Sequence, residues 1–130
     1  MSRNNHEHID YEHDLFAALC PCRSLLDLLG NKWSTLTIGA LDDGPHRFGE
    51  LQQKLAGVSP KVLTQTLRRL ESSGFVDRTV FPEVPLHVEY SLTELGGSLC
   101  APVKGLRSWA EDHIDAIRAA REGYDGRNGN

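Results

Sequence analysis

The chain has 130 residues, of which 39% are hydrophobic, and its formal net charge is −4. This composition fits one compact globular domain, and the acidic balance argues against a non-specific coat on nucleic acid. No apolar run approaches the roughly 20 residues that cross a bilayer, and the first residues do not form a signal peptide. We therefore expect a cytoplasmic protein with no membrane span.

The N-terminal residues are polar and acidic, and we expect residues 1–10 to be flexible. His6, His8 and His13 alternate with acidic residues, but their spacing matches no closed zinc site, so no metal site is predicted. Apolar residues over 11–19 then predict a short helix.

Two further helices are expected before residue 45. Cys20-Pro21-Cys22 interrupts the first helix, and the leucines from Leu25 to Leu29 predict a second one that stops at Gly30. Asn31 is a suitable N-cap for a third helix. That helix carries Trp33, Leu36, Ile38 and Leu41 and ends in the turn Asp42-Asp43-Gly44-Pro45.

Residues 47–73 predict a helix-turn-helix. The first helix, Arg47 to Ala56, has Phe48, Leu51 and Leu55 on one face, and the turn Gly57-Val58 follows. The second helix has an N-cap at Ser59, a proline at its first position and a stop at Gly74. Its core stripe is Leu63, Leu67 and Leu70.

The outer face of this second helix is polar and basic. At about 100° per residue, the positions opposite the leucines are Lys61, Thr64, Gln65, Arg68 and Ser72, with Arg69 on a flank. These side chains can donate to phosphates and to base edges in the major groove. The segment from Arg47 to Arg78 has six basic and three acidic residues, although the whole chain is acidic.

Residues 76–93 predict a β-hairpin. Its strands are 76–81 and 87–92, and two prolines lie in the connection. The alternation places one apolar set on each strand: Val76 and Val80, then Val88, Tyr90 and Leu92. Arg78 and His87 are its candidates for a minor-groove contact. A basic helix followed directly by a hairpin predicts a winged helix-turn-helix that binds DNA.

After the hairpin, Thr93 is an N-cap for a helical region over 94–122. Leu99, Val103, Leu106, Ala110, Ile114 and Ile117 form one apolar seam, and Pro102 is expected to kink or break the helix. The seam serves either a dimer interface or packing on its own domain, and we favour the dimer. Residues 123–130 are expected to be a disordered tail.

Three cysteines occur in this expected cytoplasmic protein, so structural disulfides are not predicted. A Cys20–Cys22 bridge would close a small strained ring. Cys20 precedes Pro21 at an expected helix start, where the helix dipole lowers the pKa of a thiol. It is therefore either a site of oxidation or alkylation or a small buried residue. Cys100 is expected to pack inside the C-terminal helix.

Several motifs together resemble the HxlR-type transcriptional regulators, which are related to the MarR group. They are Cys20-Pro21, Leu28-Leu29-Gly30-Asn31-Lys32-Trp33, Arg47-Phe48-Gly49-Glu50-Leu51, residues 59–65 (SPKVLTQ) and Tyr90-Ser91-Leu92-Thr93. The resemblance covers about residues 20–110.

The resemblance implies a homodimer that binds an inverted repeat near a promoter, with the dimer built by N- and C-terminal helices. Several members of the family sense oxidants, quinones or reactive aldehydes through a cysteine that matches Cys20. Two residues depart from the pattern. Cys22 lies where an aliphatic or polar residue is commoner, and His87 lies where the wing often has arginine.

We therefore predict an α+β, mostly α, winged helix-turn-helix in one domain over residues 11–122, with N- and C-terminal dimerisation helices. The predicted DNA-binding residues are Arg47, Lys61, Thr64, Gln65, Arg68, Arg69, Arg78 and His87. The predicted redox-sensing residues are Cys20 and Cys22. No catalytic residue, cofactor or metal is predicted.

Three alternatives remain open from the sequence. One is a regulator that binds a small aromatic ligand without a covalent bond, between dimer helices near Trp33 and Trp109. Another is a winged helix used only for protein–protein contact. The last is a small thiol enzyme, such as a peroxide-reducing protein, in which Cys20 is the catalytic thiol. We rank it below the others because the sequence indicates no substrate pocket and no resolving base.

Overall fold

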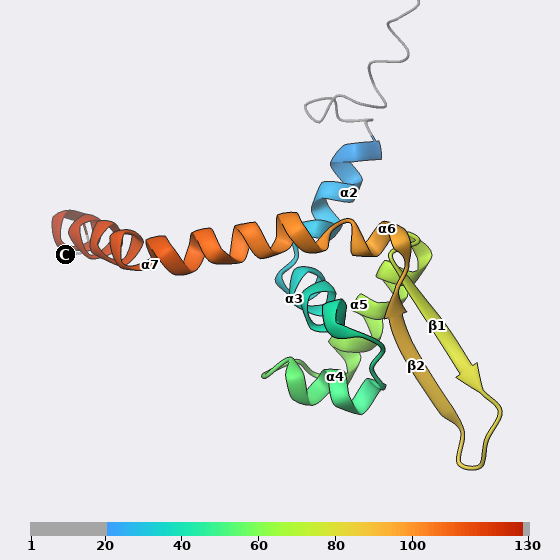
Figure 1. Ribbon diagram of the computed structural model, residues 1–130. Helices are drawn as coiled ribbons and strands as arrows, with labels where there is room; N and C mark the ends of the chain where they lie inside the picture. Colours follow the sequence, from blue (N-terminus) through green and yellow to red (C-terminus); the bar gives the residue numbers. More distant parts are fainter. Residues whose placement is uncertain (1–20, 129–130) are drawn as a thin grey trace, which may run out of the picture.

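A computed structural model describes residues 21–128 as a helical body with one two-stranded sheet and a long C-terminal helix (Figure 1). The expected helix over 11–19 and Cys20 lie outside the described residues. The elements are α2 (Pro21–Leu29), α3 (Lys32–Ala40), the 3-10 turn η1 (Leu41–Asp43), α4 (Phe48–Lys54), α5 (Pro60–Ser72), β1 (Val76–Phe81), β2 (His87–Leu92), α6 (Glu94–Gly97) and α7 (Cys100–Asn128).

The predicted helix ends of α3 and α5 are confirmed by their capping contacts. The Asn31 side chain accepts a hydrogen bond from the backbone N–H of Trp33 at 2.8 Å, and Ser59 Oγ accepts from the N–H of Val62 at 3.1 Å. Each bond satisfies a donor that the first helical turn leaves without a partner. Gly74 follows α5 with φ of 85°, a left-handed conformation that favours glycine.

The predicted leucine stripe of α5 forms the centre of the core. Leu63, Leu67 and Leu70 are buried in a cluster with residues from α3, η1, α4 and the segment that leads into β1, including Ile38, Leu41, Leu51, Phe75 and Val76. The core therefore fixes which face of α5 remains outside.

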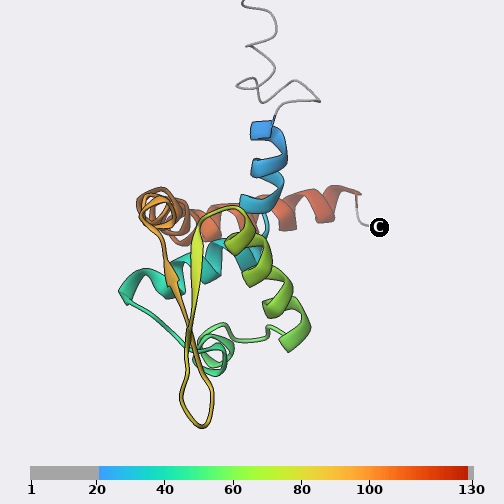
Figure 2. The ribbon, with the colours of Figure 1, turned by 90° about the vertical axis from the view of Figure 1, so that its right-hand side faces the viewer.

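The hairpin has the predicted strand bounds. Val76 lies opposite Leu92 and Val80 opposite Val88, so the apolar residues share one face of the sheet. Val76 is buried but Val80 is 43% exposed, because the strands extend past the helical body as a free wing (Figure 2).

The loop before α4 pairs with this wing. His46 N–H donates to the carbonyl of Tyr90 at 2.9 Å, and Tyr90 N–H donates to the carbonyl of His46 at 2.8 Å. This two-bond bridge fixes the start of α4 against the middle of β2. The helix-turn-helix and the wing are thereby held together as one unit.

The prediction that Pro102 kinks the C-terminal helical region or marks a break in it is confirmed only in part, since a break occurs but not at Pro102. The break falls earlier, at Ser98 and Leu99, between α6 and α7. Pro102 then lies in the first turn of α7, where its missing N–H costs no intrahelical hydrogen bond. Thr93 caps α6 as expected, since its Oγ1 accepts from the N–H of Gly96 at 3.0 Å.

The expected disordered tail differs from the structure over residues 123–128, because α7 continues through Asn128, and residues 129–130 lie outside the described part of the chain. Once a helix is formed, each added residue gains one backbone hydrogen bond. Gly123 and Gly126 therefore weaken the last turns of α7 without ending it.

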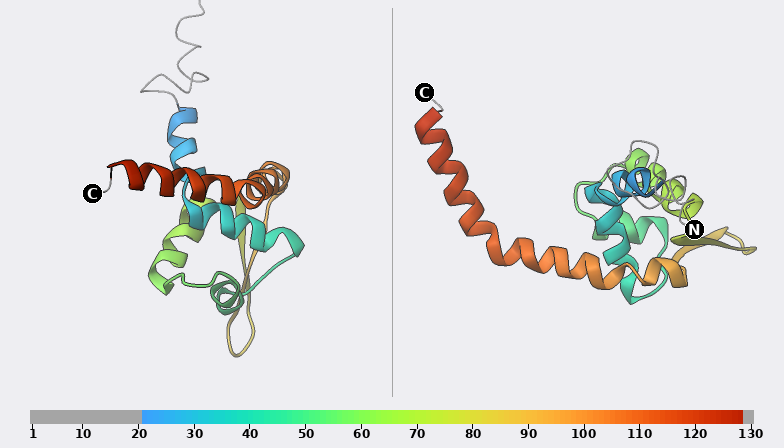
Figure 3. Two further views of the ribbon diagram at one scale, coloured as in Figure 1. Left: turned by 90° about the vertical axis from the view of Figure 1, so that its left-hand side faces the viewer. Right: turned by 90° about the horizontal axis from the view of Figure 1, so that it is seen from above.

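Most of α7 lies outside the helical body (Figures 1 and 3). Leu99 and Val103 pack on the core, whereas Leu106 is 64% and Trp109 is 53% exposed. On α2, Leu25 and Leu26 are exposed as well. Within residues 21–128, no helix is both long and apolar enough to span a membrane.

Candidate nucleic-acid interface

The outer face of α5 presents the residues that periodicity predicted. Lys61, Gln65, Arg68 and Arg69 are exposed, and Thr64 is half-buried. No carboxylate among residues 21–128 forms an ion pair with Lys61, Arg68 or Arg69. Their charges are therefore available for an external anion.

A hollow between α5 and the hairpin brings three predicted residues together. Thr64 and Arg68 line it from α5, and Arg78 lines it from β1. Arg78 lies opposite Tyr90 in the sheet, so it shares the face of the hairpin that meets α5. Glu71 is the acidic residue in this lining. The two arginines give the hollow a net positive charge.

On its other side, α5 lines a second hollow with the start of α3. Gln65, Arg68 and Arg69 contribute to it, together with Trp33 and Asn31. Arg68 thus borders both hollows at the exposed ridge of the helix. Arg69 also borders α2, so it lies on the flank away from the wing, as its helical phase predicted.

The two tryptophans suggested for an aromatic ligand lie on different helices, α3 and α7. Trp33 belongs to the hollow beside α5. Trp109 lies on α7 and stacks on His113, with ring centroids 4.3 Å apart.

Arg47 and His87 meet at the junction of α4 and the wing. Arg47 immediately precedes α4, and its backbone N–H donates to Glu50 Oε1 at 2.8 Å. Its guanidinium Nη2 lies 3.1 Å from His87 Nδ1. The His87 side chain is only 14% exposed. The exposed wing loop presents Val84 and Leu86 instead.

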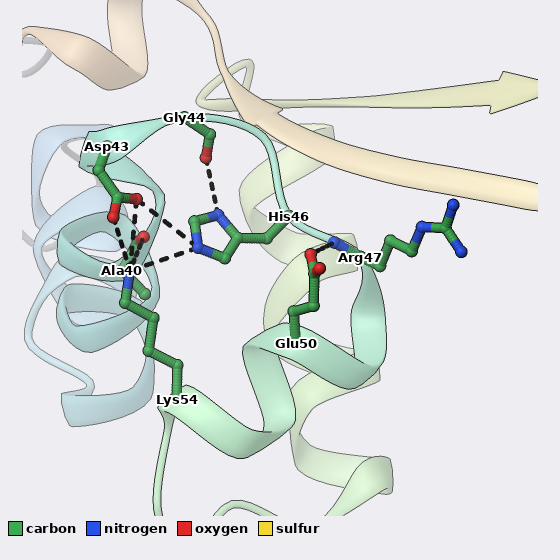
Figure 4. A network of polar contacts seen from close by, with 7 residues as sticks. All are labelled: Ala40, Asp43, Gly44, His46, Arg47, Glu50 and Lys54. Atoms are coloured by element: carbon green, nitrogen blue, oxygen red, sulfur yellow. Dashed lines mark hydrogen bonds and ion pairs between the residues drawn. The ribbon is translucent and has the colours of Figure 1, made fainter.

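A polar cluster between the end of α3, η1 and Lys54 of α4 has no counterpart in the sequence prediction (Figure 4). Lys54 Nζ donates to the carbonyl of Ala40 at 3.0 Å and to Asp43 Oδ2 at 3.1 Å. His46 Nδ1 donates to the carbonyl of Gly44 at 2.7 Å, and its Nε2 lies 3.3 Å from Lys54 Nζ. The hydrogen bond from Lys54 lowers the pKa of Asp43.

This cluster ties α4 to the end of α3 and engages Lys54, which is therefore less available to DNA than Lys61. The side chain of Arg47 points away from the cluster (Figure 4). Sequence periodicity could not reveal the cluster, because its members come from three separate segments.

Two of the three cysteines are described. Cys22 lies in the first turn of α2 and is half-buried, and Cys100 is the first residue of α7. Burial raises the pKa of the Cys100 thiol, and a hydrogen bond with Asp42 raises it further. Cys100 therefore packs as expected and has less thiolate than an ordinary cysteine. No cluster of metal-ligating side chains occurs within the part of the chain that the structure describes.

A family model described as HxlR-like helix-turn-helix matches residues 28–118. The chain belongs to this HxlR-like family. The match covers the two helices of the helix-turn-helix, the wing and most of α7. It confirms the resemblance that the sequence motifs indicated.

Individual HxlR-like relatives agree with this assignment. The HTH-type transcriptional regulator YtfH of Escherichia coli is 43% identical over 111 residues, covering 85% of this chain and 88% of the relative. The solved structure of the transcriptional regulator YtfH from Salmonella typhimurium is 45% identical with a TM-score of 0.78, covering 84% of this chain and 97% of that one.

A further solved HxlR-like neighbour is the reduced form of the transcriptional regulator YodB from Bacillus subtilis. It is 41% identical with a TM-score of 0.63 and covers 71% of this chain and 91% of that one. A diamide-treated form of YodB has also been solved. The chain is thus a helix-turn-helix transcriptional regulator with a winged-helix fold, and its family consists of regulators, not enzymes.

Proposed function

We propose that this regulator binds a specific DNA sequence by inserting α5 into the major groove. The observation that carries the proposal is the exposed face of α5, where Lys61 and Arg68 lack ion pairs within residues 21–128 and flank Gln65. Arginine and glutamine are suited to bidentate contacts with guanine and adenine. Lysine is suited to phosphate.

The other predicted residues have supporting roles in this proposal. Thr64 borders the wing side of α5 and contacts bases or phosphates there. Arg78, Arg69 and Arg47 approach the DNA backbone from the wing, from the flank near α2 and from the start of α4. Together they hold α5 in register while the ridge residues read the sequence.

The proposed DNA site is an inverted repeat bound by a homodimer. The support is the exposed apolar seam of α7, including Leu106 and Ile114, and the exposed leucines of α2. A two-fold dimer presents two copies of α5 to two half-sites related by the same symmetry.

Replacement of Arg68 tests the major-groove assignment. We expect Arg68→Ala to weaken binding to an operator selected from random duplex DNA by roughly 1–3 kcal/mol, with a smaller loss on scrambled DNA. Fluorescence anisotropy over a salt series measures both affinities. Lys104→Ala removes one positive charge from an exposed position of α7 away from the apolar seam and should leave both unchanged.

Two results would contradict the assignment. An equal loss on operator and scrambled DNA would make Arg68 a phosphate contact. If the wild-type protein showed no salt-dependent affinity for any duplex, the alternative of a winged helix used only for protein contact would replace DNA binding.

We further propose that oxidation of Cys20 changes DNA affinity. Its support is that YodB has been solved in reduced and diamide-treated forms, and that α2 begins at Pro21, directly after Cys20. A helix N-terminus stabilises a thiolate. Oxidation joins Cys20 to a thiol of the partner subunit or of a small molecule, while diamide takes up two electrons and two protons.

Cysteine variants separate this switch from a general oxidation effect. We expect diamide to change the operator affinity of the wild-type protein by about tenfold, a change near 1.4 kcal/mol. Cys20→Ser should abolish the response, and Cys100→Ser should retain it, because the raised pKa of Cys100 disfavours its reactive thiolate. The same anisotropy assay measures the effect. A response that survives in Cys20→Ser would contradict the switch and leave room for a non-covalent effector.

A further inference from the structure

His87 lies inside a small network at the end of the wing that adjoins its loop. Its Nδ1 is 3.1 Å from Arg47 Nη2, and its Nε2 is 2.8 Å from Glu89 Oε2. A second carboxylate, that of Glu83, lies 3.6 Å from Nδ1. The imidazole also packs on Phe81, with ring centroids 4.8 Å apart. These four neighbours therefore restrict the orientation of the His87 ring.

These neighbours specify the proton arrangement of a neutral His87. A carboxylate only accepts hydrogen bonds, so Nε2 carries the proton that is donated to Glu89. Nδ1 then has a free lone pair, and the Arg47 guanidinium, which only donates, supplies its hydrogen to that atom. Glu89 thus makes His87 an acceptor for Arg47.

The main chain at Arg47 is already fixed. The bridge between His46 and Tyr90 holds the preceding residue, and Glu50 accepts from the N–H of Arg47. What remains free is the long side chain of Arg47, which has many rotamers. The contact with His87 selects one of them and places the guanidinium beside the start of β2.

We propose that His87 is a positioning residue that acts on DNA through Arg47 and does not itself contact the minor groove. The inference rests on the proposed DNA binding. The guanidinium that His87 holds contacts a phosphate at the junction of α4 and the wing. The low exposure of His87 and its bond to Glu89 leave it poorly placed to reach DNA directly.

Two near-isosteric variants separate the two nitrogens of His87. In His87→Asn, the amide oxygen occupies about the position of Nδ1 and can still accept from Arg47. In His87→Gln, the amide nitrogen reaches about the position of Nε2 and retains the bond to Glu89. Operator affinity is measured for both across a salt series, in the wild-type and in the Arg47→Ala background.

We expect His87→Gln to weaken operator binding roughly fivefold, a coupling of ordinary size for neighbouring residues. It should also reduce the salt slope by up to about 0.9, the contribution of one phosphate contact. His87→Asn should retain both values. In the Arg47→Ala background, His87→Gln should cause no further loss.

Additive losses from His87→Gln and Arg47→Ala would overturn the inference, because a direct DNA contact or a purely structural role for His87 persists without Arg47. A loss in His87→Asn equal to that in His87→Gln would overturn it too. Melting temperatures of all variants show whether folding has changed. If the wild-type protein binds no operator, the proposed function fails; if it binds and the losses add, only the role of His87 fails.

Discussion

Gly96→Ala is expected to destabilise the protein by about 3 kcal/mol, at the upper end of overpacking effects. Gly96 is buried in α6, and a β-carbon there would lie far inside van der Waals contact with the carbonyl oxygen of Phe75. It would also approach Leu92 Cδ2 to 3.2 Å. The Phe75 carbonyl cannot easily move away, because it already accepts from the N–H of Thr93 at 3.1 Å.

The neighbouring glycine provides a matched control. A β-carbon at Gly97 would meet no atom within 4 Å, so Gly97→Ala should be neutral or stabilise the protein by up to about 1 kcal/mol through helix propensity. Urea unfolding followed by circular dichroism measures both variants. If Gly96→Ala were as stable as Gly97→Ala, α6 would not pack on the link between α5 and β1 in the way described.

Leu106→Glu is expected to raise the dissociation constant of the proposed dimer by at least about 100-fold, because an interface that buries an unpaired charge loses several kcal/mol. Leu106 lies in the α7 seam and is 64% exposed in the single chain. The charge is therefore tolerated in the monomer, and it makes the free energy of dimer association less favourable. Sedimentation velocity over a concentration series measures the change.

Ser108→Glu adds the same charge to α7 about 200° around the helix from Leu106, and it should leave the dimer unchanged. If Leu106→Glu dimerises as well as the wild-type protein, the α7 seam is not the interface. A wild-type protein that is monomeric at all concentrations would contradict the proposed dimer itself.

The elements that could be predicted from sequence depend on local signals. Ser59, Pro60 and Gly74 mark the ends of α5, and the spacing of its leucines fixes its buried face, so the outer face follows without knowledge of the fold. The strands of the wing were predictable for the same reason. Fold and family could therefore be inferred before any contact was known.

What could not be predicted depends on contacts between distant segments. Arg47 and His87 are 40 residues apart, and the bridge between His46 and Tyr90 joins two separate elements. Each of these residues has several plausible partners in the sequence alone. The sequence identified His87 as a candidate DNA contact, whereas the structure shows that its ring nitrogens face Arg47 and Glu89.

The unsupported length of α7 has a mechanical consequence. It meets α3 at Arg107, whose guanidinium lies close to Gly39, and α7 continues to Asn128. At about 1.5 Å per residue, a tilt of about 10° at that contact would displace the far end by roughly 5 Å. In a dimer joined through α7, a sub-ångström change near α2 and α3 would thus be amplified into a change in the spacing of the two α5 helices. Because half-sites recur at about 34 Å along DNA, such a displacement is large enough to move one α5 helix out of its major groove.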